Sequence, residues 1–166
     1  MPLLKSLEKW DGRQTALLEK IYQTEDDLIK KLLCLLNKGD KVQIAATWLL
    51  KKHLEEQGSI TKKQILQIYQ QIDIFTSWQS KLHILESMPY MAIPKTVKPK
   101  IAQFLHQHLT DTNKLIRAWS YNGLFLLSQQ YPEYQKDVNA MLDMALRDEA
   151  ASVKARIRNI RKESGS

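Results

Sequence analysis

The sequence indicates an all-α solenoid, because one pattern recurs four times along its 166 residues. In each copy an Asn or Asp lies five residues before an apolar residue, and a polar hydrogen-bond donor follows that apolar residue at once. The four anchors are Asn37, Asp73, Asp111 and Asp148, and the pairs that follow them are Val42-Gln43, Trp78-Gln79, Ile116-Arg117 and Val153-Lys154. The anchors are 36, 38 and 37 residues apart. A period of this length is typical of stacked repeats, each of which buries its apolar face only against its neighbours.

Apolar positions inside each copy follow helical spacing. Counted from the apolar residue of each pair, steps 0, 4 and 7 carry Val42, Ala46 and Leu49, then Trp78, Leu82 and Leu85, then Ile116, Ser120 and Gly123, and finally Val153, Ile157 and Ile160. A second amphipathic run precedes each anchor, over residues 28–36, 65–72, 101–109 and 138–146. Each repeat is therefore expected to contain an outer helix, a turn with the anchor, and an inner helix.

Turn and cap residues divide the single expected domain, 1–166, into a cap and four repeats. The cap covers residues 1–23, with a break at Asp11-Gly12, and the repeats lie at about 24–58, 59–92, 93–131 and 132–163. Thr24 and Asp27 resemble a capping box before the first outer helix, and Gly39 and Gly58 mark turns. The prolines complete the pattern: Pro94 and Pro132 are expected where outer helices begin, and Pro99 either kinks the third outer helix or lies in its true first turn.

Composition is that of an ordinary folded protein with a basic surplus. Hydrophobic residues make up 43% and charged residues 26%, which excludes a disordered or fibrous chain. Lys and Arg total 25 against 18 Asp and Glu, a net charge of +7, which allows attraction to anionic partners. No run resembles a signal peptide or a membrane-spanning segment, so we expect a cytoplasmic protein without membrane insertion.

Several large or apolar side chains are expected in the core. Trp48, Trp78 and Trp119 are assigned to the gaps between stacked helices, and Trp10 to the cap. Cys34, the one cysteine, lies among leucines and is also expected to be buried in a helix core. A single cysteine can form neither an intrachain disulfide nor a cysteine-based zinc site.

The pattern resembles the HEAT-repeat family of armadillo-type superhelices over about residues 24–162. The resemblance rests on Asp in the turn, on the apolar-basic pairs Ile116-Arg117 and Val153-Lys154, and on the prolines of the outer helices. It implies a right-handed α-α superhelix of about four HEAT-like helix pairs, a ladder between the turn Asp and the inner-helix basic residue, and a ligand surface on the concave face. The chain departs from the family pattern at Asn37, Gln43 and Gln79.

Charge is distributed unevenly along the chain. Residues 40–58 and 74–92 each sum to zero, whereas 113–131 carry +2 and 149–166 carry +3. The residues one, five and nine positions after each apolar residue lie on the other side of the inner helix and are expected to form a concave surface. They are Gln43, Thr47 and Lys51, then Gln79, His83 and Ser87, then Arg117, Tyr121 and Phe125, and finally Lys154, Arg158 and Lys162. Tyr121 and Phe125 are expected either to pack between repeats or to make exposed contacts. The candidate binding residues on this concave surface are Arg117, Tyr121, Lys154, Arg158, His83 and Lys162.

These residues favour a non-catalytic binding scaffold. Cations beside aromatic rings can hold an acidic protein segment, the leading partner, or the backbone of a nucleic acid. The oligomeric state is left open. The alternative for the basic C-terminal helix is a solvated end cap, which a solenoid requires.

No catalytic or metal-binding motif is present in the sequence. His106 and His108 are two residues apart and point to different sides of a helix, and there is no phosphate-binding loop, nucleophile elbow or cofactor signature. The enzymatic alternative is a resemblance to the HEAT-like DNA alkylation-repair glycosylases, which use a basic concave face and a carboxylate. Here the third inner helix contains no Asp or Glu, and Glu86 of the second is the nearest candidate.

Overall fold

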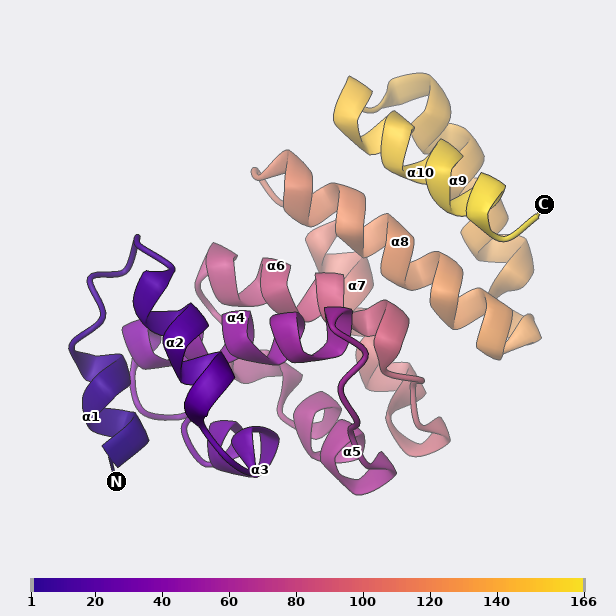
Figure 1. Cartoon of the computed structure of the whole chain (residues 1–166). Helices are drawn as coiled ribbons and strands as arrows, with labels where there is room; N and C mark the ends of the chain where they lie inside the picture. Colours follow the sequence, from indigo (N-terminus) through magenta and orange to yellow (C-terminus); the bar gives the residue numbers. More distant parts are fainter. Residues whose placement is uncertain (1, 166) are drawn as a thin grey trace. The chain divides into compact units, whose positions relative to one another are not determined.

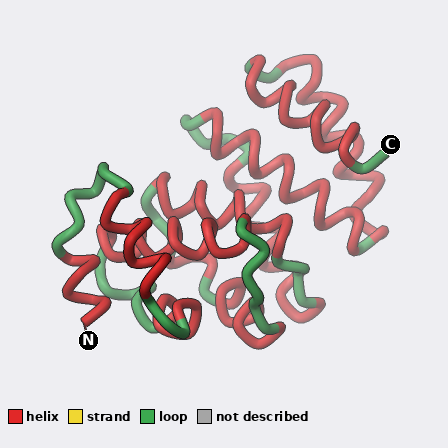
Figure 2. The backbone as a smooth tube through the Cα atoms, viewed as in Figure 1, coloured by secondary structure: helices red, strands yellow, loops and turns green. Residues whose placement is uncertain are grey.

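The computed structural model describes residues 2–165, and these form only helices and loops, without a strand (Figure 2). The prediction of an all-α protein is therefore confirmed. Contacts divide the chain into two compact units, Met1–Tyr90 and Met91–Ser166. We call them the N-terminal and C-terminal units and describe each separately. The border between them lies close to the predicted border of the second and third repeats, and the superhelical stacking of all four repeats stays a prediction.

The N-terminal unit contains the expected cap and the first two helix pairs (Figure 1). Its helices are α1 (Pro2–Glu8), α2 (Ala16–Thr24), α3 (Leu28–Leu33), α4 (Asp40–Glu55), α5 (Lys62–Gln70) and α6 (Trp78–Ser87), with 3-10 turns at Ile72–Ile74 and Met88–Tyr90. Helix α4 lies at the centre and packs against α1, α2, α3 and α6. Fully buried Leu7, Leu18, Leu32 and Leu49 hold the cap and the first pair together, because burying an apolar side chain is the main favourable term in folding.

The C-terminal unit contains the last two helix pairs. Helices α7 (Lys98–His108) and α8 (Lys114–Gln130) form one pair, and α9 (Gln135–Asp148) and α10 (Ala151–Glu163) form the other, with 3-10 turns at Lys95–Val97 and Pro132–Tyr134 before α7 and α9. Helix α8 is central and packs against α7, α9 and α10. All four inner helices, α4, α6, α8 and α10, thus follow their outer helices as predicted.

The residues at the helix N-termini differ in part from the predicted caps. The Thr24–Asp27 capping box is wrong: Thr24 ends α2 and donates to the carbonyl of Lys20, while Asp27 makes no cap bond. The capping box of this unit is instead at Thr61 and Gln64, where the hydroxyl accepts from one backbone N–H and the amide oxygen accepts from the other. Pro99 lies in the true first turn of α7, where a missing N–H costs nothing.

The register of the second inner helix differs from the prediction by two residues. The N-caps of the four inner helices are Gly39, Ser77, Asn113 and Ala150, which are 38, 36 and 37 residues apart. The third residue after each N-cap is buried, and these residues are Val42, Ser80, Ile116 and Val153. The buried stripe of α6 is therefore Ser80, Ile84 and Ser87. Trp78, assigned to the core from the sequence, is 52% exposed because it precedes this stripe.

Three other burial predictions, for Cys34, Trp48 and Trp119, were also wrong. Cys34 follows α3 as its C-cap and is exposed, although its leucine neighbours are buried. The helix ends one turn earlier than the apolar run predicts, so the thiol falls on the solvent side. Trp48 and Trp119 are half-buried rather than core residues. Trp10 is buried in the cap, where its indole N–H donates to the carbonyl of Gln14.

Candidate binding surface

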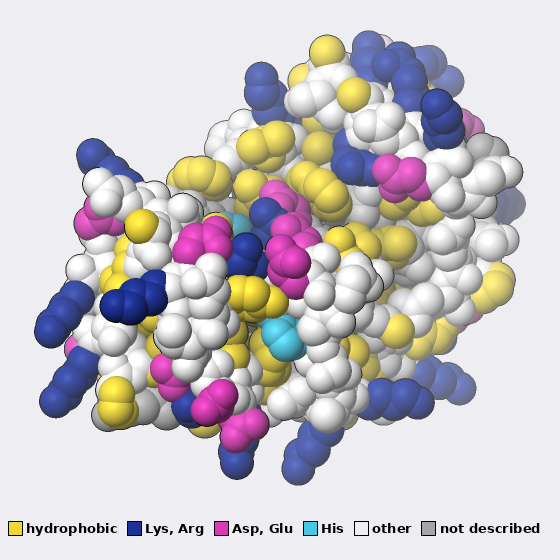
Figure 3. Space-filling view, viewed as in Figure 1, with side chains coloured by type: hydrophobic (Ala, Val, Ile, Leu, Met, Phe, Trp, Pro, Cys, Tyr) yellow, Lys and Arg dark blue, Asp and Glu magenta, His cyan; other side chains and the backbone are white. Residues whose placement is uncertain are grey.

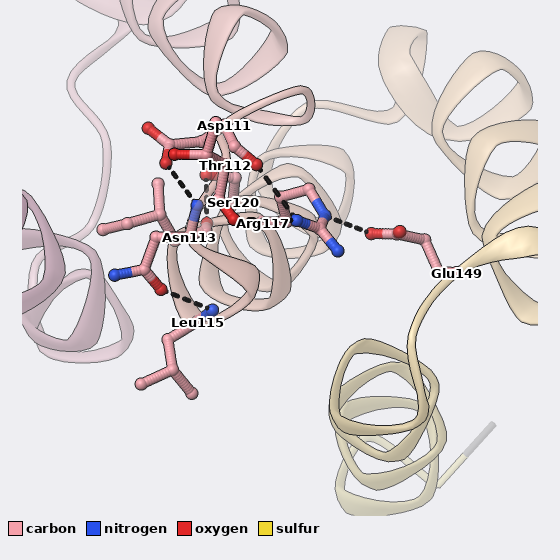
Figure 4. Close-up of polar contacts among 8 residues, drawn as sticks. Asp111, Thr112, Asn113, Leu115, Arg117, Ser120 and Glu149 are labelled. Carbon is pink, nitrogen blue, oxygen red and sulfur yellow. Dashed lines mark hydrogen bonds and ion pairs between the residues drawn. The ribbon is translucent and has the colours of Figure 1, made fainter.

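Arg117, a predicted ligand residue, is occupied within its own unit (Figure 4). Its Nε donates to Glu149 Oε2 at 2.8 Å, and its Nη1 donates to the carbonyl of Asp111 at 3.0 Å. The ion pair with Glu149 raises the pKa of the Arg117 guanidinium further. Arg117 thus joins the turn of its own helix pair to the residue that follows the anchor of the next pair, and it is not available to a partner.

Gln43 makes the corresponding connection in the N-terminal unit. Its Nε2 donates to the carbonyl of Leu36 at 2.9 Å and to that of Ile74 at 3.1 Å. Leu36 precedes the first anchor, and Ile74 follows the second. A glutamine at this position therefore bridges consecutive turns as the arginine does, although it lacks a charge. The departure from the family pattern at Gln43 does not interrupt the contact between these two helix pairs.

The anchor carboxylate has a local role that differs from the expected pairing with a basic side chain. Asp111 Oδ1 accepts the backbone N–H of Asn113 at 2.8 Å, and Asn113 in turn caps α8 by accepting from the N–H of Leu115 (Figure 4). Arg117 takes the backbone carbonyl of Asp111 instead of its carboxylate. Asp111 therefore orders its own turn, and Glu149, which the sequence pattern did not single out, supplies the negative charge that pairs with Arg117.

The expected concave row of the inner helices is wrong at three positions, because Gln43, Thr47 and Ser87 are buried. Phe125, for which packing between repeats and an exposed contact were both expected alternatives, is buried as well. Tyr121 is half-buried, and burial, followed by the nearby Glu149, raises the pKa of its hydroxyl. Trp119 carries Arg156 over its ring at 4.9 Å. The aromatic side chains of α8 are thus largely used inside the C-terminal unit.

Three predicted ligand residues on α10 remain unpaired. Lys154 is half-buried, whereas Arg158 and Lys162 are exposed, and none of the three side chains forms an ion pair or hydrogen bond with the described part of the chain. Because they are four residues apart, they lie on one side of the helix. Several Lys and Arg side chains gather over α9 and α10 in the space-filling view (Figure 3). This basic α10 face, defined by Lys154, Arg158 and Lys162, is the free part of the predicted surface.

The other cations of α10 are already partnered. Arg156 donates to Glu163 at 3.1 Å, in addition to covering Trp119, and Arg161 donates to Asp143 of α9 at 3.0 Å. The helix therefore contains two kinds of cation: those that fasten it to its own unit, and the three that do not.

His83 belongs to the N-terminal unit and is also used internally. Its Nδ1 lies 2.9 Å from Thr47 Oγ1, a fully buried hydroxyl on α4. Burial, and then the charge of Lys51, lowers the pKa of His83 to about 4. A neutral imidazole at neutral pH brings no positive charge to an anion, so His83 does not add to the charge of the candidate surface.

The side-chain geometry does not support the alternative of a DNA glycosylase. Glu86, the nearest carboxylate proposed from the sequence, forms a 2.6 Å ion pair with Lys51. Helix α8 offers no Asp or Glu. Among residues 2–165 there is no group of three or more His, Cys, Asp or Glu side chains placed to hold a metal ion.

Comparison with protein-family models, with curated proteins and with solved structures found no match. In the described range, 2–165, no helix has both the length and the apolar character needed to cross a bilayer.

Proposed function

We propose that this protein is a non-catalytic binding scaffold of HEAT-like helix pairs, which holds an acidic protein segment on the basic α10 face. The single observation that supports this proposal is the contrast within α10. Arg156 and Arg161 have carboxylate partners, whereas Lys154, Arg158 and Lys162 have none. In the proposal the four pairs stack into a right-handed superhelix in the cytoplasm, and α10 supplies its anion-binding surface.

The arrangement favours carboxylates over nucleic acid as the ligand. Sequence-independent binding of single strands combines cations with exposed aromatic rings on which bases stack. On α8 of the same unit, Phe125 is buried and Trp119 is covered by Arg156. Three flexible cations without an aromatic platform suit carboxylates, which Arg binds in a planar, two-pronged geometry and Lys as a point charge.

Fluorescence anisotropy with the full chain tests the proposal. The probes are a labelled Glu-rich peptide, a labelled DNA duplex and a labelled single-stranded RNA, all at one salt concentration. We expect the peptide to bind, and we expect the double charge reversal Arg158→Glu with Lys162→Glu to weaken its binding at least about tenfold, or roughly 1.4 kcal/mol.

The matched control is Lys62→Glu with Lys63→Glu. Both lysines are exposed at the start of α5, and reversing them changes the net charge by the same amount as reversing Arg158 and Lys162. This control variant should therefore bind the peptide nearly as the parent does. The proposal is refuted if both double variants lose the same affinity, or if the nucleic acids bind more tightly than the peptide.

A further inference from the structure

Beside its unpaired cations, α10 repeats three positions of the face by which α8 receives the next helix pair. Counted from their N-caps, α8 and α10 carry Ile116-Arg117-Ala118 and Val153-Lys154-Ala155 at the same positions. Four residues after each alanine comes an asparagine, Asn122 in α8 and Asn159 in α10.

In α8 this face is covered. Arg117 contacts Glu149, and Trp119 contacts Arg156, so side chains on both sides of Ala118 reach the last helix pair. Successive helical residues are turned by about 100°, so Ala118 and Asn122 lie between Arg117 and Trp119 around α8, which packs against α10. Both are only 3% exposed.

In α10 the same face is open. Ala155 and Asn159 are exposed. Lys154 occupies the position from which Arg117 and Gln43 each reach the turn of the following pair, yet it has no partner among the described residues. The helix thus carries the residues of a docking face, and nothing described covers them.

We infer that α10 receives an acidic helix of another protein, which docks as the next element of the series and gives a carboxylate to Lys154 as Glu149 does to Arg117. This inference rests on the proposed function and deepens it, because it names a helix rather than any acidic chain. Ala155 has no side chain beyond Cβ and lets the two helix backbones approach closely. Lys154, Arg158 and Lys162 span about 12 Å along the axis at 1.5 Å per residue, and they fit carboxylates three or four residues apart on the partner.

A second copy of this chain fits the face poorly. Symmetric pairing of two α10 helices would bring the unpaired cations of both copies together, and like charges repel in a partly desolvated interface. Charge complementarity therefore selects a partner whose exposed helix face is acidic.

The test compares two synthetic peptides of identical composition on the full chain by fluorescence anisotropy. Because their compositions are identical, both peptides contain proline. The first is a side-chain-crosslinked helix with Glu at every fourth position. The second is uncrosslinked and has its prolines in the centre, so it cannot form a helix. We expect the helical peptide to bind about tenfold more tightly. Substitution of the exposed Ala155→Trp should abolish this difference while leaving the affinity for the proline peptide unchanged. Ala155→Ser, which adds little volume, should bind both peptides as the parent does.

Each outcome is decisive. If the two peptides bind equally and Ala155→Trp changes nothing, the helix inference is overturned while the proposed function stands. If neither peptide binds, both fail. If sedimentation shows a dimer that Ala155→Trp disrupts, the occupant is a second copy and the inference of another protein is overturned. Circular dichroism of each variant confirms that the helices are intact.

Discussion

The contact of Gln43 with two consecutive turns makes a quantitative prediction about stability. Gln43 is 5% exposed, and its Nε2 donates to the carbonyls of Leu36 and Ile74. Substitution Gln43→Leu keeps the size of the side chain but removes both hydrogen bonds. The two carbonyls lose a donor, and α4 loses this polar link to the turn after α5.

The expected loss of unfolding free energy is about 2 to 3 kcal/mol. Leaving a buried acceptor without its donor costs roughly 1 to 3 kcal/mol, and two acceptors are affected. Part of this cost is returned, because Gln43 Oε1 is itself buried without a partner and leucine removes that unsatisfied atom. For a chain of this length, the loss corresponds to a decrease in Tm of roughly 5 to 10 °C.

The assay is urea denaturation followed by circular dichroism at the helical band, with Gln79→Leu as the matched control. The sequence pattern places Gln79 and Gln43 at the same repeat position, whereas the helix N-caps place Gln79 two residues earlier, and it is half-buried. We therefore expect Gln79→Leu to change stability by less than about 0.5 kcal/mol. Equal losses in the two variants would contradict both the register and the bridging role of Gln43.

Three further predictions concern single sites. The pKa of His83 is lowered to about 4, so between about pH 4 and 6.5 the unfolded chain binds more protons. Stability should therefore fall as the pH drops through this window, by up to about 3 kcal/mol, relative to a flatter His83→Gln profile from urea titrations at several pH values. Arg117→Ala should cost about 2 kcal/mol, and a double-mutant cycle with Glu149→Ala should give a coupling of at least about 0.5 kcal/mol; strict additivity would contradict the pairing. Gly58→Ala places a Cβ 2.3 Å from the ring of His53, so it should destabilise by about 1 to 2 kcal/mol, and His53→Ala in the same chain should relieve most of that loss.

The helix pairs could be predicted from the sequence because period and amphipathic spacing are averaged over many residues. Four inner and four outer helices appear where the apolar stripes place them. Single positions were less secure. The anchor-to-apolar spacing selected Trp78 in the second repeat, since a large aromatic residue fits the pattern better than Ser80 does. The N-cap Ser77 and the burial of Ser80 show that a small polar residue occupies the first buried position of α6. A pattern of hydrophobic residues cannot identify a buried serine.

The candidate surface was only partly predictable for a related reason. Sequence shows which residues are basic, but it does not show which of them have partners. Arg117 and Arg156 are as basic as Arg158, yet Glu149 and Glu163 neutralise the first two. Those carboxylates are seven or more residues away along the chain, outside the reach of the helical spacing rules that pair residues three or four apart. The missed signal was the shared Arg/Lys-Ala-x-x-x-Asn sequence of α8 and α10, which is visible only once the two N-caps are aligned.

All four inner helices carry a side-chain hydrogen-bond donor at the fourth position after the N-cap, and in two of them this donor links consecutive turns. In α4 it is Gln43, which links two turns through carbonyls alone, and in α8 it is Arg117, which links a carbonyl and a carboxylate. In α6 the corresponding residue is Lys81, and in α10 it is Lys154. A charged donor is stabilised in a half-buried place only when an anion meets it. Lys154 lies beside an exposed alanine, so a partner that brings a carboxylate would gain an interaction that Arg117 and Glu149 already make inside the chain.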